Sequence, residues 1–280
     1  MYLKPSVHRP AYTLLELVFA IVVLGIVSGI GAEIIANVYE SYIIQRAQHR
    51  ASLKTELASL QIANRLRYAI PDTIYRIKSD DTLESTNLPL SGTGDSYKGI
   101  QWVGYDGDSF ESIVSSTNRK SGWSGFADVE HPSTDISHIK TQGSSLDLTD
   151  TIISNLSPNG KSIGDAYIYF PLDTTAYRVA SDTTGDIIHL VSSASKTVKE
   201  HYKLAWSSYA LSVENRDLYL YYDFPATPAA NKGNTKQLLL KNVSTFKFKV
   251  SGRTIRFKLC IDEEIGGDYN ITSCKEKAVF

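Results

Sequence analysis

The side chains that could do chemistry in this chain are carboxylates, a few histidines and two cysteines. Two acidic groups lie in turn-rich segments, and both supply the hard oxygen ligands that calcium prefers. The first group is Asp106-Gly-Asp108 with Glu111, and the second is Asp262-Glu263-Glu264 with Asp268 and Asn270. Acidic turn residues that are simply solvated are the alternative. We therefore expect no resident metal and no cofactor, and keep Asp262, Glu264 and Asp268 as calcium candidates.

No pattern of a known catalytic site is present in the sequence. The chain has no Gly-x-Ser-x-Gly, no His-Glu-x-x-His and no phosphate-binding loop, since Gly92-Thr-Gly94 lacks a third glycine. His131 and His138 stand in a polar segment where they could bind a metal, although scattered solvated histidines are the simpler interpretation. We expect a protein that is not an enzyme.

The two cysteines, Cys260 and Cys274, enclose 13 residues near the C-terminal end of the sequence. In an oxidising compartment such a pair is interpreted as a disulfide. Closing a loop of this size contributes about 3 kcal/mol by the chain-entropy estimate. Two free structural thiols are the alternative.

One segment of the 280-residue chain, from Leu14 to Val38, is apolar and long enough to span a bilayer. Lys4 and Arg9 precede it, which predicts a cytoplasmic N-terminus and an extracytoplasmic remainder from about Tyr39 onward. The net charge is −1, from 29 basic and 30 acidic residues, so nothing indicates a nucleic-acid partner.

Glu16 is the one carboxylate near the start of this apolar segment. A carboxylate in hydrocarbon costs about 2.5–3.5 kcal/mol on insertion scales, so it needs a partner or a function. The alternative is a headgroup-level glutamate of an ordinary signal anchor, whose side chain reaches the interface.

The run Ala11-Tyr-Thr-Leu-Leu-Glu-Leu17 follows a short basic leader and precedes the apolar segment. This small–aromatic–Thr–Leu–Leu–Glu–Leu pattern resembles the prepilin-type signal of type IV pilins and type II secretion pseudopilins. The resemblance implies that a prepilin peptidase cuts between Ala11 and Tyr12 and methylates the new amine. The family usually has glycine where this chain has Ala11, from which we expect slower or lineage-specific processing.

The resemblance also implies how the subunit works. Glu16 would pair with the amine of a neighbouring subunit, while Leu14, Leu15 and Leu17 would pack between subunits. The implied partners are other pilin or pseudopilin subunits, the prepilin peptidase, an inner-membrane assembly platform and the membrane. The expected location is the bacterial inner membrane, with one pass and a periplasmic C-terminal domain, followed by assembly into a filament.

A second motif lies between Leu239 and Val250, where Leu-Leu-x-x-Val-x-x-Phe-x-Phe precedes a final hairpin. It resembles the corresponding segment of larger minor pseudopilins and minor pilins of the PilW/PulJ type.

The rival function is a membrane-anchored extracytoplasmic ligand-binding or adhesive domain that uses the Ser/Thr/Asp-rich middle of the chain.

The expected fold class is α+β: one long N-terminal helix, packed on a mainly antiparallel β-sheet domain in a pilin-like lollipop. No proline interrupts the segment from Tyr12 to Ile70, and Pro71 should end the helix. Its second half has an apolar stripe predicted to face the domain, made of Ile43, Ala47, Leu53, Leu57, Leu60, Ala63, Leu66 and Ile70.

We divide the chain into a leader (1–11), a transmembrane half-helix (12–38), an amphipathic half-helix (39–70), a variable loop-rich region (71–164) and a β-sheet region with a C-terminal disulfide loop (165–280). In the loop-rich region, Gly99–Val103 and Ser112–Ser115 are strand candidates, and Leu146–Leu156 fits either a helix or a strand. Beyond residue 165 alternating residues predict strands, with a hairpin at Ser251-Gly252.

Overall fold

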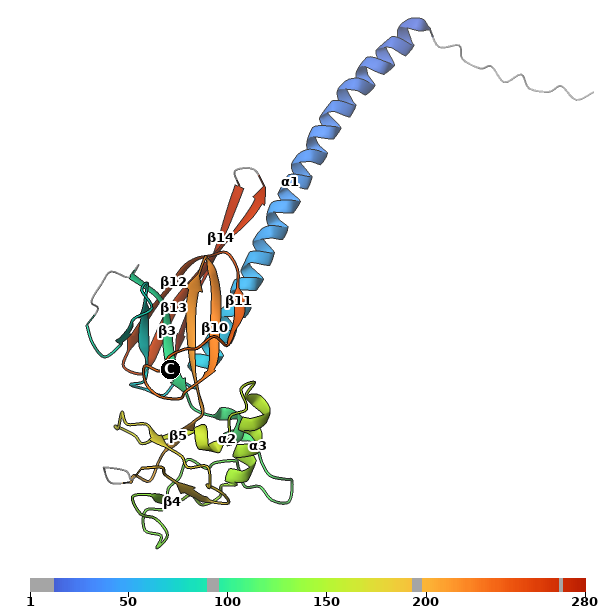
Figure 1. Cartoon of the computed structure of the whole chain (residues 1–280). Helices are drawn as coiled ribbons and strands as arrows, with labels where there is room; N and C mark the ends of the chain where they lie inside the picture. The colour runs from blue at the N-terminus through green and yellow to red at the C-terminus, as the bar shows by residue number, and fades with distance from the viewer. Residues whose placement is uncertain (1–12, 90–95, 193–197, 267–268) are drawn as a thin grey trace, which may run out of the picture. The chain divides into compact units, whose positions relative to one another are not determined.

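The computed structural model describes residues 13–89, 96–192, 198–266 and 269–280. By its contacts the chain divides into two units, Met1–Arg50 with Glu264–Ile271, and Ala51–Glu263 with Thr272–Phe280. Figure 1 shows the first element, helix α1 (Leu14–Leu66), and the strands that follow it. A long apolar N-terminal helix and a mainly antiparallel β domain are therefore both present, as the sequence predicts.

Helix α1 ends at Leu66 rather than at Ile70. The reason is a competing set of backbone partners. Ala69 forms an antiparallel bridge with Gly104, and the Ile70 N–H donates to the Val103 carbonyl at 2.9 Å. The chain thus leaves the helix by pairing with a strand before Pro71 is reached.

The part of α1 from Ala51 onward packs by a face of mostly small side chains. The predicted apolar stripe is correct at its end, where Leu66 and Ile70 are buried and Ala63 packs against the core, but it is wrong for Leu53, Leu57 and Leu60. Leu53, Leu57 and Leu60 are 49%, 60% and 42% exposed. The buried positions are Ala51, Thr55, Ala58, Ser59, Ile62 and Leu66. Small residues let the helix backbone lie close to the sheet, and the buried Thr55 hydroxyl is satisfied by donating to the Ala51 carbonyl at 2.7 Å.

A pair of substitutions tests which face of α1 is buried. Ala58→Leu adds volume to a close-packed site, so it should lower the free energy of unfolding by about 1–3 kcal/mol. Leu57→Ala, on the exposed face, should change it by less than about 0.5 kcal/mol. Urea unfolding of the full chain in detergent micelles measures both values. A larger loss for Leu57→Ala than for Ala58→Leu would mean that the leucine face of α1 is the buried one.

The main sheet has six strands in the order β11-β10-β9-β3-β1-β2, and all its pairings are antiparallel. Its strands are β1 (Tyr75–Lys78), β2 (Leu83–Ser85), β3 (Tyr97–Gly104), β9 (Ser207–Glu214), β10 (Asp217–Phe224) and β11 (Lys236–Leu240). Central strand β3 comes from the loop-rich region and pairs with β9, with Ile100 opposite Leu211. The two sequence regions therefore share one sheet.

A second sheet has three strands in the order β12-β13-β14. Its strands are β12 (Val243–Ser251), β13 (Thr254–Gly266) and β14 (Tyr269–Val279). The predicted hairpin at Ser251-Gly252 is confirmed, and Gly252 supplies the positive φ of 58° that the turn requires. The first core lies among α1 and these two sheets, and includes Ile62, Trp102 and Phe257.

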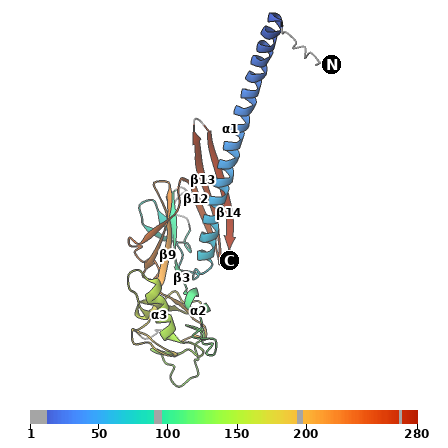
Figure 2. The same ribbon diagram turned by 90° about the vertical axis from the view of Figure 1, so that its right-hand side faces the viewer.

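A second core holds the remaining short elements together. These are α2 (Gly107–Glu111), α3 (Leu146–Leu156), the 3₁₀ turn η2 (Ile163–Asp165), β4 (His138–Lys140), β5 (Tyr167–Tyr169), β6 (Tyr177–Arg178), β7 (Ile187–His189) and β8 (Lys203–Ala205). They gather beyond one end of β3, β9 and β10, as Figures 1 and 2 both show. Trp123, Ile153, Ile168 and Leu204 are buried in this core.

The structure shows which secondary structure two segments of the loop-rich region adopt. Leu146–Leu156 is a helix, because Leu146, Thr149 and Ile153 recur at helical spacing and are buried together on one side. The predicted strand at Ser112–Ser115 is wrong: only Ile113 forms a bridge, to Ser121, in this stretch. Ile113 is 45% exposed, so the segment has no buried face to hold it in a sheet.

Candidate functional site

The start of α1 is fixed by Thr13. Its side-chain hydroxyl oxygen accepts a hydrogen bond from the Glu16 N–H at 3.3 Å, and its carbonyl accepts from the Leu17 N–H at 3.1 Å. Thr13-x-x-Glu16 is the capping-box spacing, with the acid in the first turn, where the helix dipole favours negative charge. This role of Thr13 is not among the sequence predictions above, although Thr-x-x-Glu before an apolar run is a recognised helix-start signal.

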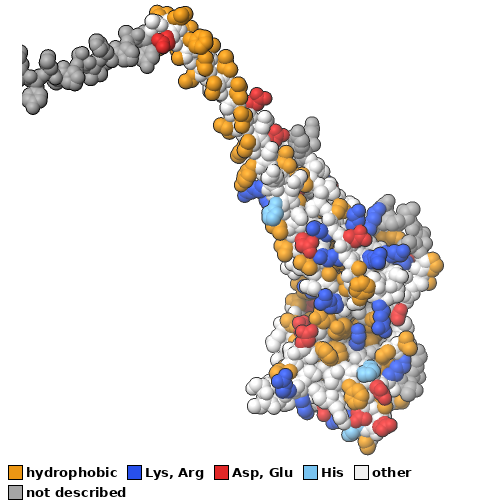
Figure 3. All heavy atoms as spheres, turned by 180° about the vertical axis from the view of Figure 1, so that it is seen from behind, with side chains coloured by type: hydrophobic (Ala, Val, Ile, Leu, Met, Phe, Trp, Pro, Cys, Tyr) orange, Lys and Arg blue, Asp and Glu red, His pale blue; other side chains and the backbone are white. Residues whose placement is uncertain are grey.

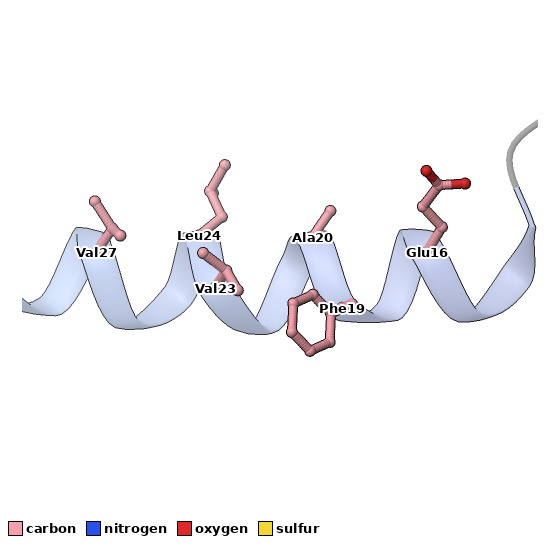
Figure 4. Close-up of a pocket in the computed structure, with 6 residues that line it drawn as sticks. All are labelled: Glu16, Phe19, Ala20, Val23, Leu24 and Val27. Atoms are coloured by element: carbon pink, nitrogen blue, oxygen red, sulfur yellow. The ribbon is translucent and has the colours of Figure 1, made fainter.

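The Glu16 side chain is exposed, and no described residue donates a hydrogen bond to its carboxylate. The capping hydrogen bond uses the backbone N–H of Glu16, so it gives the charged carboxylate of this residue no partner. Figure 4 shows the carboxylate at the end of a row in which Glu16, Ala20 and Leu24 point to the same side of the helix. Phe19 and Val23 extend this apolar surface along α1.

From Leu14 to Val38, α1 carries large apolar side chains on all sides, and Glu16 and Glu33 are the charged residues of this part. Leu14, Leu15 and Leu17 are 82%, 80% and 57% exposed. Hydrophobic side chains cover the first part of α1 in the space-filling view (Figure 3). The core helix of a soluble protein would be buried, yet none of the most apolar window of α1 is buried. Among the described residues α1 is the one helix able to span a membrane.

The predicted processing residues, Ala11 and Tyr12, lie outside the described residues. The predicted assembly residues are all described: Leu14, Leu15, Glu16 and Leu17 lie together in the first turns of α1, directly after Thr13.

Thr13 gives a test of helix capping that is separate from the charge of Glu16. Thr13→Ala should cost about 1 kcal/mol at the helix start. Hydrogen exchange at the Glu16 and Leu17 amides should then be about five times faster in micelles. Thr13→Ser keeps the hydroxyl and should retain protection. Equal exchange in all three proteins would show that the cap contributes nothing.

The predicted disulfide between Cys260 and Cys274 is present, so the alternative of free thiols is wrong. Cys260 is buried, at 3% exposure, in strand β13. Cys274 lies in β14, the neighbouring strand of the three-stranded sheet. The bond therefore links two adjacent strands, whereas the sequence alone predicts a C-terminal disulfide loop.

The C-terminal calcium candidates do not form a cluster in the described part of the chain. Asp262 is already engaged: one oxygen lies 3.3 Å from the Arg216 guanidinium, and the other accepts from the Thr272 hydroxyl at 2.8 Å. Glu264 is exposed on β13, and Asp268 lies outside the described residues. No group of three or more His, Cys, Asp or Glu side chains among the described residues is arranged to hold a metal.

The other acidic group has structural roles. Asp106 caps α2, where its Oδ1 accepts from the Ser109 N–H at 3.1 Å, and Glu111 accepts from the Tyr68 hydroxyl at 3.3 Å. Asp106 is only 4% exposed, and its Oδ2 has no hydrogen-bond partner among the described residues. Burial raises the pKa of this carboxyl above its ordinary value.

Asp106 therefore predicts a pH-dependent stability. Its folded-state pKa is raised, so its contribution is complete below the ordinary carboxyl pKa and is lost as pH rises through the folded-state pKa. Asp106→Asn stays neutral and can still cap α2, so it should raise the urea midpoint at neutral pH. This gain should shrink in acid. Exposed Glu130→Gln is the control, and a gain independent of pH would contradict the assignment.

The histidines considered in the sequence analysis lie in different settings. The Nδ1 of His131 accepts from the Ser133 N–H at 3.1 Å in a turn. His138 lies on β4, directly opposite His189 of β7.

No family model matches the chain, and neither a curated protein nor a solved structure does.

Proposed function

We propose that this chain is a minor pilin or pseudopilin, a structural subunit of a type IV pilus or a type II secretion pseudopilus. A prepilin peptidase cuts between Ala11 and Tyr12 and methylates the new amine of Tyr12. The mature chain is stored in the bacterial inner membrane with its C-terminal domain in the periplasm. An inner-membrane assembly platform then packs it against other pilin or pseudopilin subunits.

The observation that carries this proposal is the unburied apolar helix that starts at Leu14, inside the cleavage motif and close behind the proposed cut. Its large side chains are exposed from Leu14 to Val38, so in water they need lipid or another protein surface around them. A cap at Thr13 lets the helix begin close behind the new N-terminus at Tyr12. The same helix serves first as a membrane anchor and then as an assembly surface.

Glu16 supplies the second support. Its carboxylate has no partner in the described chain, and leaving it unpaired among apolar side chains costs free energy. A cationic N-terminal amine on a neighbouring subunit offsets that cost by pairing with it in a low-dielectric surrounding. Pairing of this kind also fixes the axial position of each subunit, because Glu16 is the single charge in the first four turns of α1.

The chain contributes no energy source of its own in this mechanism. Its sequence contains no phosphate-binding loop, so assembly depends on a separate cytoplasmic ATPase. The part of α1 from Ala51 to Leu66 stays packed on the β domain, which leaves the apolar segment before it for subunit contacts.

A fractionation experiment tests the proposed function. In cells that contain the assembly machine, the chain should appear in sheared filaments or in the cross-linked pseudopilus fraction. Deleting the machine's ATPase should return it to the membrane fraction. A chain that stays in the membrane whether or not the ATPase is present is instead the anchored ligand-binding or adhesive domain.

A further inference from the structure

Two histidines face each other across the small antiparallel ladder of β4 and β7. His138 lies directly opposite His189. The Leu190 N–H donates to the Ser137 carbonyl at 2.8 Å, which places the ladder hydrogen bonds on either side of this pair. His138 and His189 are therefore a non-hydrogen-bonded pair, the position in an antiparallel ladder where opposing side chains lie closest.

Each imidazole is also held by a carboxylate. His138 Nδ1 lies 3.1 Å from the Asp135 carboxylate, and His189 Nδ1 lies 3.2 Å from Asp182 Oδ2. A carboxylate on Nδ1 selects the tautomer that leaves the Nε2 lone pair free, and the same arrangement orients imidazoles in metal sites.

The separation of the rings suits one metal ion. Their centroids lie 4.9 Å apart with an interplanar angle of 80°. Two imidazoles on one tetrahedral zinc, at a Zn–N distance of about 2.0 Å, have centroids about 5 Å apart. The side chains of His138 and His189 are 48% and 32% exposed, so an ion can reach them from solvent.

We propose that His138 and His189 bind one divalent transition-metal ion, such as Zn²⁺, through their Nε2 atoms. Asp135 and Asp182 orient the two rings and make them more basic from the other side. Two protein ligands leave the remaining coordination positions to water or to a ligand from another molecule. The site is independent of the assembly helix and of the proposed function.

The test is Zn²⁺ titration of the full-length chain in detergent micelles by isothermal calorimetry. One zinc ion should bind per chain. His138→Ala and His189→Ala should each weaken binding at least tenfold, and Asp182→Asn should weaken it by about tenfold through the outer hydrogen bond. His131→Ala and His201→Ala are matched histidine controls and should leave the affinity unchanged.

A second measurement uses the wild-type chain alone, so its result does not depend on whether the variants fold. Zinc should shift the imidazole nitrogen NMR signals of two histidines, and assignment should identify them as His138 and His189. The proposal is overturned if the wild-type chain binds no zinc. It is equally overturned if zinc binds with unchanged affinity in His138→Ala and His189→Ala, or shifts other histidines.

Discussion

Replacing Glu16 by alanine should reduce the amount of chain in the filament fraction at least tenfold while leaving membrane insertion intact. In the proposed assembly, the substitution removes the partner of a neighbouring subunit's amine, which would then lie unpaired among apolar side chains. An unpaired charge there costs about 2.5–3.5 kcal/mol, and each 1.4 kcal/mol is a factor of ten in an equilibrium. Carbonate extraction of membranes and quantification of sheared filaments measure the two properties separately.

Glu33→Ala is the matched control for this experiment. Glu33 is also an exposed acid on the apolar part of α1, but it lies outside the first turn and outside the motif. It should assemble nearly as well as the wild type. Normal filament incorporation of Glu16→Ala, or equal loss in both variants, would contradict a specific pairing role for Glu16.

Removing the disulfide should cause the largest loss of stability. The double variant Cys260→Ala/Cys274→Ala should lower the free energy of unfolding of the β domain by about 3 kcal/mol. The bond restricts the conformations open to the unfolded chain, and it links Cys274 of β14 to the buried Cys260 of β13. Urea unfolding in micelles, followed by tryptophan fluorescence, gives the value.

Reduction of the wild-type chain is the internal control for that loss. Dithiothreitol should destabilise the wild type by a similar amount and should not affect the double variant. Equal stability of oxidised and reduced wild type would show that the strands of this sheet hold without the bond.

The sequence predicts the helix and the disulfide because both depend on local or compositional signals. An unbroken apolar run without proline is sufficient to predict α1. The buried face of its second half is predicted only in part, because hydrophobicity favours Leu53 and Leu57 over Ala51 and Ala58. The sheet surface selects small side chains there, and a sequence pattern does not contain that tertiary requirement.

Long-range pairing accounts for most of what the sequence does not predict. Strand β3 lies beside β9, far along the chain, and the last part of the expected disulfide loop is the beginning of strand β14. In the sequence His131 is the histidine nearest to His138, whereas the ladder places His138 opposite His189. Contacts of this kind depend on which strands pair in the sheet. The alternation of apolar and polar residues within one strand does not specify that pairing.

The most direct test of the proposed function is the N-terminus of the chain isolated from its native membranes. Mass spectrometry of the N-terminal peptide should identify Tyr12 as the first residue, with one methyl group on its amine. Processing slowed by Ala11 would leave a fraction of unprocessed chain beside this product. A chain that starts only at Met1, or that is cut after the apolar segment, would contradict the account.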